Sequence, residues 1–309
     1  MRPPRTTVTP GAAIVAIVTV LSLMRVGVPD VRAQALPANL SSGADPAALA
    51  DMTPSETTDR PLSDIQTLKA ASDETLGSEV AFAISGASVT NGYGDWYGFH
   101  LRGLHHEGNS TFLGEVAELQ RFGERTTFGS INYITDFDAD WYGAVGFSGT
   151  TAGTILPSAR FDVSINRKLL PQRSLVLSVG AGYAWNRSDH KDQLYHVGLI
   201  WYVVPQWILE AGWNYDIDSP GSIKAPAYYA AVTYGEVGKS LIAVRGGYGR
   251  EAYQSVGIAN QLVDFDSKEA SVRWRYWFTR KWSTQLQFEY YHNPFYNRYG
   301  GEVSALYQF

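Results

Sequence analysis

Hydrophobic and polar side chains alternate along residues 78–309 in segments of about ten residues, the length that a tilted strand needs to cross a membrane. In residues 281–291, KWSTQLQFEYY, apolar side chains such as Leu286 fall on one face and polar ones such as Gln285 on the other. A period of two is typical of a β-strand. The apolar face suits contact with lipid, and the small or polar face suits a wet interior.

Fourteen segments of this kind are predicted, with twelve as the alternative count. An even number of antiparallel strands lets the first strand pair with the last, which leaves no unpaired strand edge in hydrocarbon. We therefore expect an all-β fold, a transmembrane antiparallel up-and-down β-barrel. The predicted strands lie near residues 79–88, 95–104, 110–120, 125–135, 140–148, 158–167, 174–186, 192–203, 206–216, 226–235, 239–249, 268–278, 281–291 and 297–309.

The connections between these segments mostly alternate in length, as they do in bacterial outer-membrane barrels. Aromatic residues flank two of the short turns, in WYVVPQW (201–207) and YWFTRKW (276–282), as an interfacial aromatic belt would. A soluble antiparallel barrel is the alternative, but its outward face would need to be polar. Short periplasmic turns are predicted at 105–109, 136–140, 167–173, 203–206, 235–239 and 278–281, and longer outer loops at 148–157, 216–226 and 250–267.

The final residues, YQF, place Tyr307 and Phe309 on the apolar face of the last segment. Aromatic residues at these two positions resemble the signal by which outer-membrane barrels are recognised by their assembly machinery. Three further segments carry a family resemblance: LQRFGERTTFGSINY (119–133), TILPSARFDVSINRKLL (154–170) and SLVLSVGAGYAW (174–185). Through them, residues 78–309 resemble the YaiO family of outer-membrane β-barrel proteins. That resemblance implies a role beside exopolysaccharide biosynthesis and secretion components.

The N-terminal part of the chain is predicted to direct export. Residues 1–35 form a predicted signal peptide, with Arg2 and Arg5 before an apolar stretch at 12–24 and small residues up to Ala35. An uncleaved anchor is the alternative, but about 13 apolar residues are short for a helical span. Residues 36–77 contain no aromatic residue, so we expect a disordered periplasmic tail with a short helix near DIQTLKAAS.

Composition narrows the class of protein further. The chain is 45% hydrophobic but has no long apolar run beyond its N-terminus, which argues against a helical membrane protein. A net charge of -5 argues against a nucleic-acid partner. The absence of cysteine excludes disulfide bonds and a lipid attached to a cysteine. We expect a protein of the outer membrane of a Gram-negative bacterium, with membrane lipids and the barrel assembly machinery as partners.

The sequence contains only incomplete versions of known catalytic and metal-binding motifs. GFSGT (146–150) has the wrong spacing for a nucleophile elbow, and no H-E-x-x-H motif is present. DFDADW (136–141) begins like a calcium loop but has Trp141 where glycine is needed, so a solvated acidic turn is expected. His105 and His106 are expected to be solvated turn residues, and His100 and His196 to face the lumen. We predict no catalytic, cofactor-binding or metal-binding residues and no cofactor.

The predicted lumen carries charges of both signs. These charges suit either a polar passage that holds an anionic or sugar-like solute, or ion pairs that plug the interior. On the second interpretation, Arg273 and Arg275 would clamp Glu289 on the next strand. The principal lumen-facing candidates are Arg102, Glu210, Arg245, Arg273, Arg275 and Glu289, and the further inward positions are Glu115, Arg160, Asp162, Arg298 and Glu302.

Three functions remain open at this point. The first is a non-enzymatic YaiO-like barrel that assists envelope polysaccharide assembly or export, or that passes small hydrophilic solutes. The resemblance implies polysaccharide secretion components as its partners. The second is an outer-membrane lipid-modifying hydrolase, which an inward serine, histidine and acid within hydrogen-bond reach would favour. The third is a plugged structural or docking barrel. The first is preferred.

Overall fold

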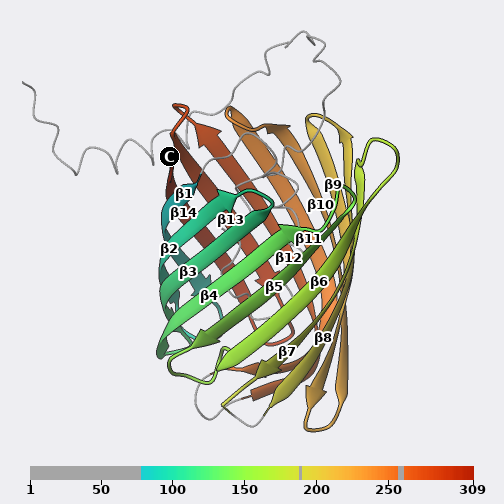
Figure 1. The fold of residues 1–309 in the computed structure, drawn as a ribbon. Coiled ribbons are helices and arrows are strands. Elements are labelled where there is room, and N and C mark those ends of the chain that lie inside the picture. Colours follow the sequence, from blue (N-terminus) through green and yellow to red (C-terminus); the bar gives the residue numbers. More distant parts are fainter. Residues whose placement is uncertain (1–77, 188–189, 257–260) are drawn as a thin grey trace, which may run out of the picture. The chain divides into compact units, whose positions relative to one another are not determined.

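Fourteen antiparallel strands close into a single barrel in the computed structural model, which describes residues 78–187, 190–256 and 261–309 (Figure 1). Each strand pairs with its neighbours in sequence, and β1 pairs with β14 to close the sheet. The predicted fold and the count of fourteen strands are confirmed. The strands are β1 (Glu79–Val89), β2 (Trp96–Glu107), β3 (Ser110–Arg121), β4 (Glu124–Asp136), β5 (Trp141–Thr150), β6 (Ala159–Leu169), β7 (Leu175–Trp185), β8 (Lys191–Val204), β9 (Trp207–Ser219), β10 (Ile223–Glu236), β11 (Ser240–Ser255), β12 (Gln261–Trp277), β13 (Trp282–His292) and β14 (Asn297–Gln308).

The predicted signal peptide at 1–35 and the predicted tail at 36–77 lie outside the described residues, as does the short helix expected near DIQTLKAAS. In the ranges that are described, no helix has the length and hydropathy needed to cross a membrane.

The seam between β1 and β14 holds the barrel closed. Every residue of β1 has a partner in β14, from Glu79 opposite Gln308 to Val89 opposite Arg298. Beyond the last pair, the backbone N–H of Phe309 donates to the carbonyl oxygen of Ser78 at 2.9 Å. We call the end of the barrel that holds this bond the terminal end, and the opposite end the far end. The closed ladder leaves no strand edge to be satisfied by lipid.

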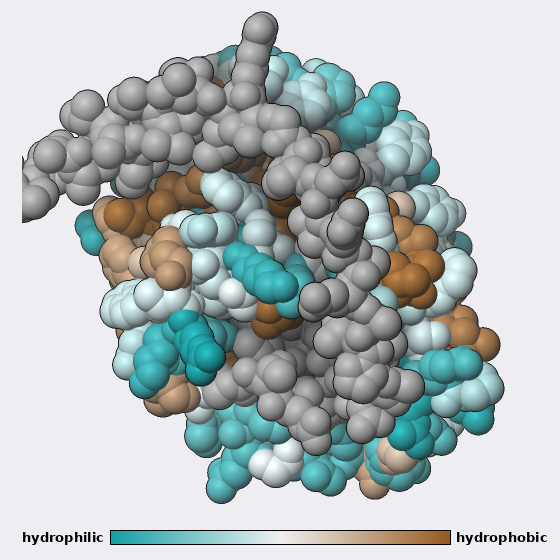
Figure 2. Space-filling model, turned by 90° about the horizontal axis from the view of Figure 1, so that it is seen from above, coloured by the Kyte–Doolittle hydropathy of each residue, from teal (hydrophilic) through white to brown (hydrophobic). Residues whose placement is uncertain are grey.

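The outward face is apolar, as the alternation predicts. Large side chains on this face are exposed to the surroundings, including Phe82 and Phe99 at about half of their surface. Exposing such an apolar surface to water would be unfavourable in free energy, whereas in a bilayer it contacts hydrocarbon. Figure 2 views the barrel from above, where hydrophilic side chains are plentiful and hydrophobic patches lie toward the edge.

Two predicted outer loops are wrong, because the strands beside them are longer than expected. The predicted loop at 216–226 is mostly strand, since β9 and β10 stay paired as far as Asp218 opposite Ile223. The predicted loop at 250–267 is also mostly strand, since β11 and β12 stay paired out to Ser255 opposite Gln261. Two of its polar residues, Glu251 and Gln254, are buried and hydrogen-bonded rather than solvated. Glu251 accepts a hydrogen bond from the hydroxyl of Tyr291 at 2.6 Å.

The interior is layered rather than uniformly polar. Near the terminal end, inward apolar side chains of β2 to β5 and β7 to β9 pack together, which the expectation of a polar face did not include. We call this set the inner apolar cluster; it contains Leu104, Leu113, Ile134, Tyr142, Ala144, Val176, Ile200 and Ile208.

A second group of buried side chains gathers at the far end. We call it the far-end cluster; it contains Val89, Trp96, Phe122, Val256, Leu262, Phe265, Tyr291 and Tyr296. The rings of Phe122 and Tyr296 lie 5.9 Å apart, although β1 and β2 separate β3 from β14. Three steps between strands span about 14 Å of wall. The connections must therefore fold inward across the mouth to bring these two rings together.

Candidate functional site

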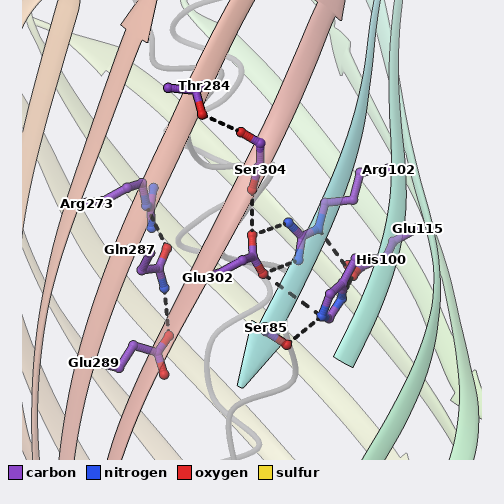
Figure 3. A network of polar contacts seen from close by, with 10 residues as sticks. All are labelled: Ser85, His100, Arg102, Glu115, Arg273, Thr284, Gln287, Glu289, Glu302 and Ser304. Carbon is purple, nitrogen blue, oxygen red and sulfur yellow. Dashed lines mark hydrogen bonds and ion pairs between the residues drawn. The ribbon is translucent and has the colours of Figure 1, made fainter. Parts of the chain in front are cut away.

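Charged side chains form a bonded network on the inner wall between the two apolar clusters, on β1, β2, β3 and β14 (Figure 3). Arg102 of β2 is at its centre and is almost fully buried. Its guanidinium donates to both carboxylate oxygens of Glu302, at 2.7 and 3.0 Å, and to Glu115 at 3.2 Å. Two charge-assisted hydrogen bonds to one carboxylate fix both position and orientation. Arg102 thus joins β2 and β3 to the closing strand.

The same network contains a serine that the sequence did not single out. Ser85 Oγ lies 2.9 Å from His100 Nε2, and His100 Nδ1 lies 2.8 Å from Glu115 Oε1. The three residues stand on β1, β2 and β3 at a constant separation of fifteen positions. This is the arrangement of an inward serine, histidine and acid that would favour a hydrolase over a simple barrel.

Arg275 makes a second buried pair, with a partner that the sequence analysis did not predict. Its guanidinium donates to the carboxylate of Glu79 at 2.5 and 3.3 Å and to the hydroxyl of Ser283 at 3.1 Å. It also lies over the ring of Trp277, 4.4 Å from the centroid. Arg275 is 0% exposed. Arg275 therefore joins β12 to β13 and β1 and stabilises the wall, rather than presenting its charge to a passage.

The predicted clamp of Glu289 by Arg273 and Arg275 is corrected accordingly. Arg273 donates to Gln287 at 3.1 Å, and Gln287 donates to Glu289 at 2.6 Å, so Arg273 reaches this carboxylate through an amide (Figure 3). Glu289 lies 3.6 Å from Arg298 of β14. The predicted clamp fails because Arg275 lies one inward position nearer the terminal end than Arg273. There its guanidinium contacts Glu79 instead of Glu289.

On the opposite wall, guanidinium and aromatic groups are stacked. Arg245 of β11 lies over the ring of Tyr229 of β10, 3.8 Å from the centroid, and 3.9 Å from the carboxylate of Glu269. A small cavity of about 30 Å³ borders these three side chains. Glu210, the remaining candidate, is on β9 opposite Ala231 and is half-buried.

A second cavity, of about 50 Å³, opens beside Ser85. Arg121, Arg298 and Trp96 line it, and each guanidinium lies over the Trp96 ring, at 4.9 and 4.7 Å from the centroid. Stacked guanidinium and aromatic groups provide both a flat apolar face and hydrogen-bond donors. These two features together suit the apolar faces and the hydroxyl or carboxylate groups of a sugar.

The turn DFDADW is held by hydrogen bonds to one of its own side chains. The side chain of Asp138 accepts hydrogen bonds from the backbone N–H groups of Asp140 and Trp141, at 2.7 and 2.8 Å, and Asp140 pairs with Arg173. Across the described ranges, no group of histidine and acidic side chains has the arrangement of a metal site.

Tyr307 and Phe309, the predicted assembly signal, lie on the outward face at the terminal end. The Tyr307 ring packs against Trp282 of β13 at 4.8 Å and against Phe309 at 6.2 Å between centroids. Phe309 is two-thirds exposed. The pair belongs to an aromatic belt that also contains the predicted Trp201, Trp207 and Tyr276, all exposed. Its role in assembly stays a prediction.

Known proteins support the same fold. The CymD monoaromatic hydrocarbon channel matches with a TM-score of 0.53 at 8% identity, over 78% of this chain and 91% of that one. The TodX deltaS2S3 mutant, also a monoaromatic hydrocarbon channel, matches with a TM-score of 0.53 at 10% identity, over 79% and 92%. A bacterial polysaccharide outer membrane secretin matches with a TM-score of 0.47 at 9% identity, over 77% and 100%. For the two hydrocarbon channels, at these identities, the likeness is one of fold.

No curated protein matches the sequence. The model of the YaiO membrane beta barrel domain, however, matches residues 78–254, which is more than half of the chain and includes β1 to β10 and most of β11. This chain belongs to the YaiO family of outer-membrane β-barrels.

Proposed function

We propose that this barrel passes hydrophilic solutes across the outer membrane, and that its solutes are saccharides of the envelope during polysaccharide assembly or export. The main support is the stacking of Arg245 on Tyr229 beside a small cavity, repeated by Arg121 and Arg298 on Trp96. Aromatic faces bind the apolar side of a sugar ring, and guanidinium groups bind its hydroxyl and acidic groups. Repeated weak sites favour transit, because a solute must also leave each one.

The interior charges indicate which solutes suit this route. Arg245 lies over the Tyr229 ring beside a cavity, so we take it, together with Arg273 on the neighbouring strand β12, as a candidate for setting anion preference. The polysaccharide role draws on the family, whose relatives are associated with exopolysaccharide biosynthesis and secretion. A solute can pass only if the side chains of the far-end cluster move apart or leave an opening between them, because they extend across the mouth.

Planar-bilayer recording of the full-length protein tests this proposal. The parent protein should give steady conductance that an acidic oligosaccharide reduces by occupying the stacked sites. Arg245→Gln and Arg273→Gln should lower the ratio of anion to cation permeability, because each removes a positive charge from the inner wall. Tyr296→Ala should raise conductance, because it removes a ring that reaches across the far-end mouth.

Arg125→Gln is the matched control. Its pair with Glu118 is exposed, with Arg125 at 77% of side-chain surface, so its loss should leave ion preference unchanged. A bilayer that stays silent for the parent and for Tyr296→Ala alike would contradict passage. It would favour the docking barrel, for which the paired interior charges are the supporting observation.

A further inference from the structure

Ser85, His100 and Glu115 form a diagonal line across three adjacent strands, about halfway along β1. Ser85 is opposite Gly98, two residues before His100, and Glu115 is opposite Arg102, two residues after His100. Diagonal neighbours on one face of an antiparallel sheet lie within reach of long side chains. Register alone therefore brings the hydroxyl to one ring nitrogen and the carboxylate to the other, at 2.9 and 2.8 Å.

The hydrogen bonds select a tautomer of His100. Because Glu115 accepts from Nδ1, that nitrogen carries a proton, and Nε2 lies 2.9 Å from Ser85 Oγ and 4.0 Å from a carboxylate oxygen of Glu302. When Nε2 carries no proton, it can accept the proton of Ser85. Arg102 holds Glu115 in place from the other side at 3.2 Å, and is itself bound by Glu302. The acid, base and nucleophile thus have the roles of a Ser-His-acid triad, including a residue that orients the acid.

Space at the serine fits a nucleophile. Ser85 borders the cavity of about 50 Å³, while His100 is buried behind it at 1% exposure. Gly98 makes this pairing possible, because a Cβ on that residue would contact Ser85 Oγ and come within 2.6 Å of His100 Nε2. A purely structural serine would not need an adjoining cavity.

We infer that Ser85, His100 and Glu115 hydrolyse short-chain acyl esters of saccharides inside the barrel. Ser85 Oγ bonds to the ester carbonyl carbon while its proton moves to His100 Nε2. The bond from that carbon to the sugar oxygen breaks, and His100 returns the proton to this oxygen. Water then attacks the acyl-serine, His100 takes a proton from the water, and the carboxylic acid leaves as Ser85 regains its hydrogen. One ester and one water yield one alcohol and one acid.

The substrate class follows from position and size. Ser85 is on the inward face of β1, whereas Ile84 faces outward, so the hydroxyl is turned away from membrane lipid. A water molecule needs about 10–15 Å³ of such space, so the cavity beside the hydroxyl holds a few non-hydrogen atoms, such as an acetyl group. Arg121 and Arg298 beside it can donate to a carbonyl oxygen or to an acidic sugar. The saccharide part of this inference rests on the proposed passage function.

Ester hydrolysis by the purified full-length protein in detergent is the direct test, with p-nitrophenyl acetate and p-nitrophenyl palmitate as the two probes. The acetate should be turned over, and the palmitate should not. Ser85→Ala and His100→Gln should each lower kcat by about a thousandfold or more. A fluorophosphonate should label Ser85, located by mass spectrometry of the digested protein. Ser178→Ala, at a buried inward serine of β7, is the matched control and should retain full turnover.

Glu115→Gln tests a positioning role, because it keeps the size of the side chain and removes its charge. It should lower kcat with little change in KM and leave the barrel folded. Glu115→Asp should restore part of the rate. Gly98→Ala should lower turnover by displacing Ser85 from His100. Equal turnover in the parent and Ser85→Ala, or no turnover by the parent, would overturn the inference. A preference for palmitate would overturn the substrate class.

Passage and hydrolysis can fail separately. Passage is measured by the conductance of the parent protein in the planar bilayer, and hydrolysis by its turnover of the acetate, so the two results are independent. Conductance without ester hydrolysis would overturn this inference and leave passage standing. Hydrolysis of the acetate in a silent barrel would support the triad and contradict delivery of its saccharide through the interior.

Discussion

Arg275 shows how a single interior residue can decide stability rather than selectivity. Arg275→Met should destabilise the barrel by about 3–5 kcal/mol, because the Glu79 carboxylate would remain buried without its guanidinium partner. The free energy of unfolding in urea, measured with the protein inserted in lipid vesicles, checks this.

The double variant Arg275→Met/Glu79→Leu is the informative companion, since removing both charges removes most of the desolvation cost. It should be more stable than Arg275→Met alone. A double variant as unstable as the single one would show that packing on Trp277, and not the ion pair, carries the effect.

At the same scale, the sequence predicts which face a residue occupies but not which residue it contacts. Arg102, Arg245 and Arg275 are placed on the inner wall by alternation alone. Their partners depend on strand register, and register across a turn of uncertain length cannot be read from a pattern. Ser85 was missed for this reason: its contact with His100 needs the β1–β2 register to be known to one residue.

Among the elements, the closing strand β14 carries the exposed aromatic end. Deletion of Phe309 should reduce the amount of barrel inserted in the outer membrane, because it removes the aromatic end of the strand that the assembly machinery is expected to recognise. It also removes the backbone hydrogen bond to Ser78. Heat-modifiable gel migration of the membrane fraction measures the inserted amount.

Phe309→Tyr keeps an aromatic ring and the backbone N–H, so insertion should stay near that of the parent. Phe309→Ala keeps the backbone N–H but removes the ring. It therefore separates loss of the aromatic ring from loss of the hydrogen bond to Ser78. Insertion of Phe309→Ala at the parent level would contradict a role for the ring and assign the effect of the deletion to the backbone.

The strand lengths of β11 and β12 illustrate what element-level patterning misses. The hairpin's outer half, including Glu251 and Gln254, is polar on its inward face and was expected to be a loop. In the structure these groups bond to the hydroxyls of Tyr291 and Tyr296, at 2.6 and 2.7 Å. Polar strand residues with distant partners have the same local pattern as a solvated loop, so only the folded barrel distinguishes the two.

For the whole molecule, closure can be tested because the chain contains no cysteine. Ile84 of β1 is directly opposite Val303 of β14, and both side chains face outward. Directly opposed residues in an antiparallel pair have Cα atoms about 4.5–5.5 Å apart, within the range that a disulfide bridges. Ile84→Cys/Val303→Cys should therefore form a disulfide on oxidation, detected as a migration shift in a denaturing gel that a reductant reverses.

The companion pair Ile84→Cys/Ala305→Cys is on the same face but displaced by two residues along β14. Diagonal neighbours are about 7–8 Å apart, too far for a disulfide without movement of the backbone. This pair should stay reduced. If it cross-links instead of the opposed pair, the seam is shifted by two residues. Such a shift would displace β14 against β1, and with it Glu302 against Arg102 and Ser85. If neither pair cross-links, the barrel is not closed by these strands. Glu302 of β14 would then not be positioned to bind Arg102.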